Sequence, residues 1–306
     1  MLPFDLDPIK STLKRYHFPV DVIVETNASC NLKCILCPQP TLKRQKGEMK
    51  FDIFKKIVDE IVAKSPATRL WMALMGEPLL MGDRLVTMIK YARDRGIHSV
   101  HLNTNAVFLS YELSDKLIAA GLDEIIISLD AHTRSTYDKI RIGGDFHRVI
   151  DNVNYLLNRR KELGRDNPIV YAQFIVMDQN AHEIEDFKKY WLQKGAVAKV
   201  RRQLGWGTGV EAPHLTLPDS ERTFPCPWIT RAVGIQWNGR FVQCDGDYEG
   251  VYSPGDINVQ TIEEVWSGEL AKRREKHWAL DFSHDLCSKC KDWQACRSQF
   301  YYPTGR

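Results

Sequence analysis

The sequence lacks an apolar run that could cross a membrane, since no stretch reaches the ~20 consecutive apolar residues of a transmembrane helix. Its first residues, MLPFDLDPIK, lack the basic start and apolar stretch of a secretory signal peptide. Neither sign of charge is in excess, because 42 basic and 39 acidic residues give a formal charge of +3. Such a balance offers no electrostatic argument for nucleic acid or an anionic membrane as partner. We therefore expect a cytoplasmic protein that binds neither nucleic acid nor a membrane.

The composition is otherwise that of an ordinary globular protein, with 43 % apolar and 26 % charged residues among 306. This length suffices for one large α/β domain and a smaller one. The chain contains 8 cysteines, which fall into two groups along the sequence. In a reducing compartment, grouped cysteines indicate metal binding or catalysis rather than disulfides.

Apolar strands alternate with helical stretches over the first 205 residues. We predict strands at 20–26, 69–75, 98–105, 123–130, 169–177 and 196–203. Helical patterns lie at 49–63, 83–96, 110–121 and 181–195, with a further helical region that ends near 163, and glycines end several of them. Six β–α units in series predict a parallel sheet, either open and doubly wound or closed into an incomplete barrel. In both folds, functional residues gather at the carboxyl ends of the strands.

The pattern changes near residue 206, where glycines and prolines become frequent and five of the eight cysteines follow. Residues 233–244 predict a β-hairpin with Asn238-Gly239 as its two-residue turn. Residues 263–278 predict a helix. We expect this last third to form a small cysteine-rich domain.

The first cysteine group is Cys30, Cys34 and Cys37, spaced C-x3-C-x2-C directly after the first predicted strand. A structural zinc site uses four ligands, and the nearest histidines, His17 and His98, lie on other predicted elements. A four-iron cluster held by four cysteines carries electrons. Held by three, such a cluster has one iron free to bind another molecule. The alternatives are zinc, or three cysteines that only pack in the core.

This spacing, after the first strand of six β–α units, resembles the radical S-adenosylmethionine (SAM) superfamily. The resemblance implies a partial (β/α)6 barrel in which the free iron of a [4Fe–4S] cluster binds SAM. It also implies reductive cleavage of SAM to a 5′-deoxyadenosyl radical, which abstracts a hydrogen atom from the substrate. An electron donor such as flavodoxin or ferredoxin would then be a partner.

The resemblance further implies SAM contacts at positions that follow the family's order along the chain. These positions are Gly76, Glu77 and Pro78, which resemble the family's GEP motif, Asn103 and Asn105, Ser128 and Asp130, and Arg141. In that motif, backbone and carboxylate hold the SAM ammonium, and the arginine pairs with the SAM carboxylate. The alternatives are that Asn103-Thr104-Asn105 is only a turn and Arg141 only a surface charge. Leu36 departs from the aromatic residue often found before the last cysteine, yet it still supplies apolar cover.

The second group resembles the SPASM domain, or its shorter Twitch relative, of radical SAM enzymes. Its spacing is C-x12-G-x4-C from Cys226 to Cys244, followed by C-x2-C-x5-C from Cys287 to Cys296. A full SPASM domain has seven cysteines, whereas Phe300 stands where a further one is expected. We therefore expect one auxiliary [4Fe–4S] cluster. Its expected ligands are Cys226, Cys244, Cys287 and Cys290, with Cys296 spare, and zinc is the alternative metal.

The resemblance divides the chain into an N-terminal extension (1–19), a partial-barrel domain (20–205) and an auxiliary-cluster domain (206–306). Only about 19 residues precede the first predicted strand, which leaves no room for a peptide-recognition domain. We therefore expect a small-molecule substrate such as a sugar, glycoside or aminocyclitol. Trp206, Trp228 and Trp237 are either ring-stacking residues at the domain junction or core aromatics.

The expected reaction is oxidation or epimerisation. A free Cys296 thiol could return a hydrogen atom to the opposite face of a substrate radical, which is epimerisation, or it could be inert. The alternative functions are a peptide-modifying maturase, a two-cluster electron-transfer protein and a zinc-binding structural protein.

Overall fold

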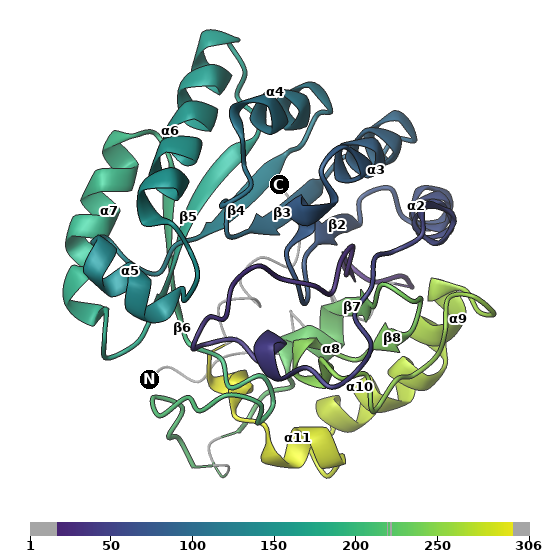
Figure 1. Ribbon diagram of the computed structural model, residues 1–306. Helices are drawn as coiled ribbons and strands as arrows, with labels where there is room; N and C mark the ends of the chain where they lie inside the picture. The colour runs from purple at the N-terminus through teal and green to yellow at the C-terminus, as the bar shows by residue number, and fades with distance from the viewer. Residues whose placement is uncertain (1–16, 219, 221, 296–306) are drawn as a thin grey trace.

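A computed structural model describes residues 17–218, 220 and 222–295. Six parallel strands follow one another across the sheet in chain order (Figure 1). They are β1 (Asp21–Val24), β2 (Arg69–Met72), β3 (Val100–Thr104), β4 (Glu124–Ser128), β5 (Ile169–Val176) and β6 (Val197–Arg202). This order, in which each strand pairs with its predecessor, is that of a barrel left open. The predicted α/β fold with a partial (β/α)6 barrel is confirmed.

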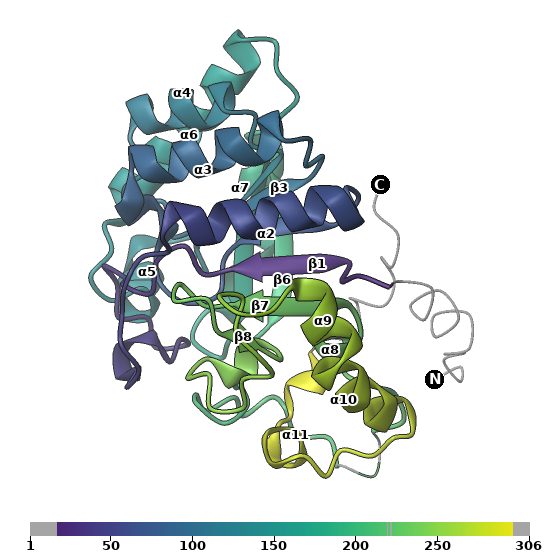
Figure 2. The ribbon, with the colours of Figure 1, turned by 90° about the vertical axis from the view of Figure 1, so that its right-hand side faces the viewer.

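The helices between these strands form an outer layer over one face of the sheet (Figure 2). They are α2 (Phe51–Lys64), α3 (Asp83–Asp94), α4 (Tyr111–Ala119), α5 (Arg134–Ile140), α6 (Phe146–Glu162) and α7 (Ile184–Gln193). Ser110 caps α4 by accepting a hydrogen bond from the Leu113 N–H. The helical region predicted up to residue 163 is two helices, because the chain turns at Gly143, whose φ is +90°.

The two faces of the sheet differ sharply in chemistry. Val22, Leu70 and Leu102 face the helices and are fully buried in the main core. The residues between them, such as Asp21, Trp71 and His101, face the concave side, since successive strand side chains alternate. There the Asp21 carboxylate accepts hydrogen bonds from the Trp71 indole and from the Arg69 guanidinium. The concave face is therefore polar where the helix-facing side is apolar.

The sheet continues into the cysteine-rich region, which the sequence did not predict. β7 (Ala232–Ile235) pairs in parallel with β1, and β8 (Phe241–Val242) pairs antiparallel with β7. The predicted hairpin is confirmed, but its two-residue turn is wrong. The Gln236 N–H donates to the Arg240 carbonyl and Gly239 adopts φ +97°, so the loop has three residues. Three-residue hairpin loops place glycine in this left-handed conformation.

The remaining helices lie in the same lower part of the molecule as β7 and β8, with α11 at its bottom edge (Figure 1). They are α8 (Pro227–Arg231), α9 (Ile262–Ser267), α10 (Glu269–Trp278) and α11 (Asp285–Lys289). The single helix predicted over 263–278 is two helices that meet at Gly268. A Cβ on Gly268 would lie 2.6 Å from the Glu264 carbonyl oxygen, so this break requires glycine.

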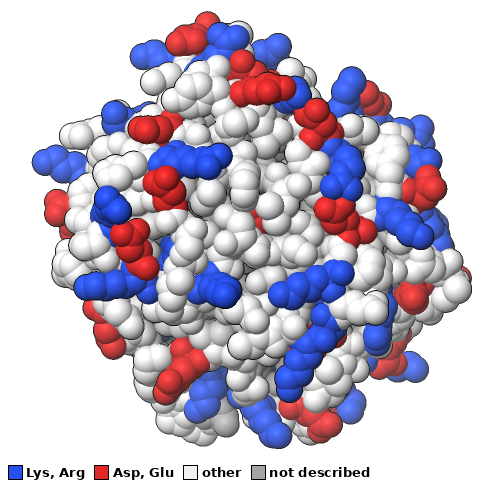
Figure 3. All heavy atoms as spheres, in the orientation of Figure 1, with Lys and Arg blue, Asp and Glu red and all other residues white. Residues whose placement is uncertain are grey.

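No helix among the described residues is both long and apolar enough to span a membrane. On the face shown in Figure 3, basic and acidic side chains are interspersed. This mixture accords with the near-neutral charge of the whole sequence.

Candidate functional site

The loop that carries Cys30, Cys34 and Cys37 leaves the carboxyl end of β1 and is fastened on both sides. On one side, the Lys33 and Ile35 N–H groups donate to carbonyls at the end of α5, at 2.9 and 3.1 Å. On the other side, the Trp206 indole donates to the Leu36 carbonyl at 3.0 Å. The segment after β6 therefore holds the loop against the end of α5.

The C-terminal region adds further anchors to this loop. The Glu249 carboxylate accepts from the backbone N–H groups of Lys43 and Arg44 at 2.9 and 3.0 Å. The Trp237 indole donates to the Gln45 carbonyl at 3.1 Å. Trp206 and Trp237 thus fasten the loop, whereas Trp228 lies in α8, where its indole nitrogen is buried without a described hydrogen-bond partner.

The three thiols of the loop lie in a buried, mutually coupled group. Burial raises the pKa of Cys30 to about 11 and that of Cys37 to about 12. The nearest donors are the Leu32 N–H, 3.5 Å from the Cys30 sulfur, and the Gln39 N–H, 3.5 Å from the Cys37 sulfur. Cys30 and Cys37 therefore stay protonated until a metal displaces the protons, because only the thiolate is a metal ligand. The donor set therefore fits an iron centre.

The predicted GEP segment, Gly76 to Pro78, lies directly beneath this loop. Gly76 has φ +82°, and a Cβ there would lie 1.9 Å from the Asn27 carbonyl oxygen. Only glycine permits this close approach of two backbones. The Glu77 N–H then donates to the Ser29 carbonyl at 2.8 Å, which ties the segment to the residue before Cys30.

The Glu77 carboxylate is buried and accepts three hydrogen bonds. Its donors are the Leu79 N–H at 3.0 Å, the Thr104 hydroxyl at 2.6 Å and the Asn105 N–H at 2.8 Å. Burial raises its pKa, although these donors oppose the shift. A carboxylate has about four acceptor positions, so one position on Glu77 remains without a donor. Two of these bonds, from Thr104 and Asn105, hold the turn after β3 against Glu77.

Asp130 and Arg141 meet as a buried pair next to the cysteine loop. The Arg141 guanidinium pairs with the Asp130 carboxylate and also donates to the Cys34 sulfur at 3.5 Å. Burial raises the pKa of Asp130, against the effect of Arg141. Burial alone would lower the pKa of Arg141, but the Asp130 carboxylate raises it above its usual value. Arg141 is only 8 % exposed, so the surface-charge alternative is wrong.

Two buried polar atoms near the cysteine loop are unpaired within the described part of the chain. Asn103 Oδ1 and Arg141 Nε are both buried and make no hydrogen bond to any described residue. Asn105 donates to the Asn31 side chain at 2.9 Å and lies 3.8 Å from the Cys30 sulfur. Ser128 ends β4 on the concave face. An unmet acceptor and an unmet cationic donor suit a zwitterionic ligand such as the methionine part of SAM.

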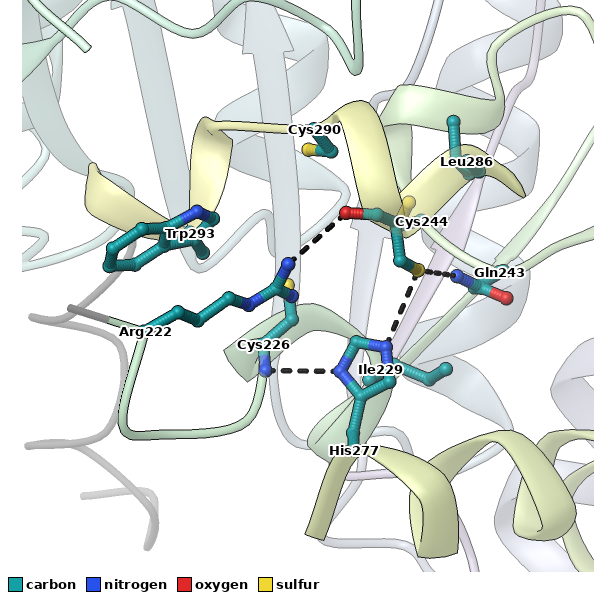
Figure 4. Close-up of a pocket in the computed structure, with 10 residues that line it drawn as sticks. Arg222, Cys226, Ile229, Gln243, Cys244, His277, Leu286, Cys290 and Trp293 are labelled. Atoms are coloured by element: carbon teal, nitrogen blue, oxygen red, sulfur yellow. Dashed lines mark hydrogen bonds between the residues drawn. The ribbon is translucent and has the colours of Figure 1, made fainter. Parts of the chain in front are cut away.

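The four predicted auxiliary ligands, Cys226, Cys244, Cys287 and Cys290, line one cavity (Figure 4). The cavity encloses about 310 Å³ of space free of protein atoms, part of it open to solvent. Burial raises the pKa of all four thiols, that of Cys226 to about 12. Cys296 lies outside the described residues. The four cysteines therefore converge from α8, β8 and α11 as a cluster site requires.

Two side chains donate hydrogen bonds to the sulfur of Cys287, and no sequence motif indicated either of them. Gln243 Nε2 lies 3.2 Å from this sulfur, and His277 Nε2 lies 3.3 Å from it. The Cys226 N–H donates to His277 Nδ1 at 3.3 Å, so Nε2 carries the imidazole proton (Figure 4). Burial, followed by Arg222 and His284, lowers the pKa of His277 to about 3. The imidazole is a neutral donor to this sulfur.

Asp292, two residues after Cys290, binds the segment that follows β6. The Asp292 carboxylate accepts from the Gly205 and Gly207 N–H groups at 2.5 and 2.8 Å, on either side of Trp206. Trp206 therefore connects the two cysteine groups, since its indole bonds to Leu36 and its neighbours bond to Asp292. Within the described residues, no three His, Cys, Asp or Glu side chains group closely enough for one metal ion.

Two family models match the chain. Residues 24–190 match the radical SAM superfamily, and residues 226–292 match the SPASM iron–sulfur cluster-binding domain. The chain belongs to the radical SAM superfamily and carries a C-terminal SPASM domain. It is an enzyme whose cofactors are SAM, a radical SAM [4Fe–4S] cluster and one or more auxiliary clusters. The electron-carrier and zinc-structural alternatives are therefore wrong.

Curated relatives differ in how much of their length the chain spans. It is 31 % identical to the AdoMet-dependent heme synthase of Methanosarcina barkeri, over 92 % of each chain. It is 24 % identical to the tungsten-containing aldehyde ferredoxin oxidoreductase cofactor-modifying protein of Pyrococcus furiosus, over 57 % of this chain and 49 % of that one. The chain thus spans about half the length of the second relative.

Solved structures share the fold at low sequence identity. BtrN in complex with AdoMet and 2-DOIA has a TM-score of 0.62 at 18 % identity, covering 89 % of this chain and 92 % of that one. Streptococcus suis SuiB bound to its precursor peptide SuiA has a TM-score of 0.69 at 13 % identity, covering 95 % and 73 %. These similarities show a common architecture for proteins that bind a small molecule and a peptide.

Proposed function

We propose that this radical SAM enzyme oxidises a small polar molecule, such as a sugar, glycoside or aminocyclitol, by abstracting a hydrogen atom from it. The observation that carries this proposal is the four-cysteine lining of the auxiliary cavity. Four thiolates saturate a four-iron cluster and leave no iron open to substrate, which suits electron transfer. Oxidation requires such an acceptor for the second electron, whereas epimerisation requires a hydrogen donor. The proposed donor, Cys296, lies outside the described residues.

In this proposal, Cys30, Cys34 and Cys37 hold the SAM-binding cluster. Cys226, Cys244, Cys287 and Cys290 hold a single auxiliary cluster. When bound, the first cluster with SAM supplies a 5′-deoxyadenosyl radical, and the auxiliary cluster supplies an electron acceptor. We keep the division at residue 205, with β7 extending the barrel sheet from the C-terminal domain.

The protein's own residues would orient SAM and shield the site. The free acceptor position on Glu77 suits the SAM ammonium, and Arg141 Nε suits its carboxylate. Gly76 and Pro78 shape the backbone that holds Glu77, and Asn103, Asn105, Ser128 and Asp130 complete the proposed SAM contacts. The Trp206–Leu36 bond closes the loop toward the C-terminal region, which limits the access of water to the radical.

Support for a small-molecule substrate comes from the BtrN comparison, where each chain covers about nine-tenths of the other. Candidate substrates deuterated at single carbons provide the test. The enzyme is reconstituted and reduced without oxygen, and 5′-deoxyadenosine is analysed by mass spectrometry. Deuterium transfer from a sugar or cyclitol carbon, with a ketone product, is expected. Transfer only from peptide substrates would contradict the proposal.

A peptide substrate is the second candidate. The chain is 25 % identical to the PqqA peptide cyclase of Granulibacter bethesdensis over 94 % of its length. SuiB and this chain also share their fold over 95 % of this chain. The same deuterium assay with labelled peptides separates the two candidates. A flavodoxin or ferredoxin is the proposed electron donor, and replacement of dithionite by either protein tests it.

A further inference from the structure

One arginine, Arg222, lies among the four cysteines of the auxiliary cavity (Figure 4). Its guanidinium lies over the Phe282 ring, 3.6 Å from the ring centre, and 5.8 Å from the centre of the Trp293 ring. It also donates a hydrogen bond to the Cys287 carbonyl at 3.2 Å. Two aromatic rings and a backbone carbonyl therefore hold this guanidinium in the lining of the cavity.

The Arg222 guanidinium is not neutralised by a carboxylate within the described part of the chain. Its described hydrogen bond is the one to the Cys287 carbonyl, and its Nε atom is buried without a partner. Arg141, beside the other cysteine group, is instead paired with Asp130. Because arginine keeps its charge in proteins, Arg222 brings an uncompensated positive charge to the auxiliary cysteines.

Other charged groups near the cavity do not take over this role. Among the described residues that line the cavity, Arg222 is the one with a permanent positive charge. Arg273 is paired with Glu269 at 3.1 Å. The neighbouring acidic groups, Asp245 and Asp292, carry no positive charge in either protonation state. Without Arg222, the lining would thus contain no full positive charge.

A positive charge beside a four-thiolate cluster favours its reduction. The cluster and its thiolates are negatively charged, and this charge grows when one electron is added. A nearby cation therefore stabilises the reduced state more than the oxidised one, and low solvent exposure strengthens the effect. In the proposed oxidation, the substrate radical loses one electron and its hydroxyl proton as the ketone forms. The proton passes to water and the electron adds to the cluster, so a higher potential favours this step.

We propose that Arg222 raises the midpoint potential of the auxiliary cluster and thereby makes it an acceptor for the electron of the substrate radical. This inference rests on the proposed function, in which that cluster is the electron acceptor. The role differs from that of Gln243 and His277, which donate hydrogen bonds to the Cys287 sulfur. Arg222 bonds to the carbonyl of Cys287 and acts on the cluster through its charge.

The test is the midpoint potential of the auxiliary cluster, measured by EPR titration in the full-length chain without Cys30, Cys34 and Cys37. Arg222→Gln keeps an amide that can donate to the Cys287 carbonyl, but it removes the charge. It should lower the equilibrium constant of reduction about ten-fold or more, which for one electron is a shift of about 59 mV. Arg222→Lys keeps the charge and should restore most of the potential.

Arg274→Gln is the matched control. Arg274 also lies over an aromatic ring, that of Trp266 at 3.6 Å, and donates to the Trp266 carbonyl at 2.6 Å. It does not belong to the cavity lining, so its replacement should leave the potential unchanged. An unchanged potential in Arg222→Gln, or equal shifts in Arg222→Gln and Arg222→Lys, would overturn the inference.

Phe282 offers a second test that keeps Arg222 in place, for the case that Arg222→Gln does not retain the auxiliary iron. Phe282→Asp places a carboxylate against the guanidinium and should lower the potential relative to the neutral variant Phe282→Asn. Equal potentials in these two variants would overturn the inference. The potential is measured without substrate, so such a result would leave hydrogen abstraction untouched. The expected shifts, combined with no ketone from any sugar or cyclitol, would contradict the proposed oxidation and support the role of Arg222.

Discussion

The Arg141 guanidinium lies 3.5 Å from the sulfur of Cys34, although 107 positions separate the two residues. The same guanidinium pairs with the fully buried Asp130 carboxylate. One side chain thus links the cysteine loop to the segment that follows β4. Its remaining nitrogen, Nε, is buried without a described partner and is the atom we assign to the SAM carboxylate.

Replacing Arg141 by methionine is expected to reduce both stability and SAM affinity. Asp130 would stay buried without its cation, which costs about 3–5 kcal/mol of unfolding free energy. Denaturant unfolding of the iron-free protein measures this loss. The double variant Asp130→Asn, Arg141→Met should recover part of it, because no charge is then left unpaired. If the losses of unfolding free energy in the single variants Asp130→Asn and Arg141→Met add up to the loss in the double variant, the two side chains are not directly coupled.

Each alanine variant of Cys30, Cys34 or Cys37 is expected to lose SAM cleavage, because two thiolates do not hold a cluster with a free iron. The measurement is 5′-deoxyadenosine formation after reduction. Cys226→Ala is the matched control, and it should lose auxiliary iron while still cleaving SAM. Persistent cleavage in the triple variant would refute the assignment of this loop.

Glu77→Ala is expected to weaken SAM binding by roughly 1.5–3 kcal/mol, the contribution of a charged hydrogen bond, with iron content unchanged. The variant also leaves the hydrogen-bond donors of Leu79, Thr104 and Asn105 without an acceptor, so its stability must be measured separately. Thr104→Val removes one of these donors but leaves the carboxylate. It should affect stability more than SAM affinity. Equal SAM affinity in wild type and Glu77→Ala would make Glu77 a positioning residue only.

His277→Phe is expected to shift the auxiliary cluster to a more negative midpoint potential by tens of millivolts. A hydrogen bond to a cluster sulfur stabilises the more negative, reduced state, and the phenyl ring removes the Nε2 donor to Cys287. The potential is measured by EPR titration in a background without Cys30, Cys34 and Cys37. Gln243→Leu should act in the same direction. An unchanged potential in both variants would exclude these donors as determinants.

Lys199→Met is expected to stabilise the protein near pH 7. Burial lowers the Lys199 pKa from 10.5 to about 8, so the unfolded chain binds more protons between these two values. Below pH 8 the buried, charged lysine therefore lowers the free energy of unfolding by its full amount. This destabilisation disappears as the pH rises toward 10.5. Denaturant unfolding across this range measures the difference between variant and wild type. A gain that is constant with pH would contradict this origin, and Lys194→Met serves as the exposed control.

Several features could be predicted from local information in the sequence. The six β–α units were predictable because side-chain periodicity and capping residues such as Ser110 are encoded within a few positions. The first cysteine group was recognisable because three cysteines lie within eight residues. The spacing of the second group predicted that four of its cysteines belong to one site, and these four line one cavity in the structure.

Other features depended on contacts between distant parts of the chain. The parallel pairing of β7 with β1 joins residues more than 200 positions apart, and no local pattern specifies that partner. The donors to Cys287 come from β8's neighbour Gln243 and from α10, so their role appears only once these elements pack together.

The sequence by itself determined the superfamily and pointed to the cysteines that we propose as cluster ligands, because short spacings set the chemistry of a cluster loop. Tertiary structure alone decided that Arg141 is buried beside Cys34, that Glu77 carries the turn after β3, and that Arg222 lines the auxiliary cavity. The physical reason is that burial and charge compensation depend on which strands and loops become neighbours. A strand's alternation defines two faces, but only packing decides which face meets the helices and which meets the substrate.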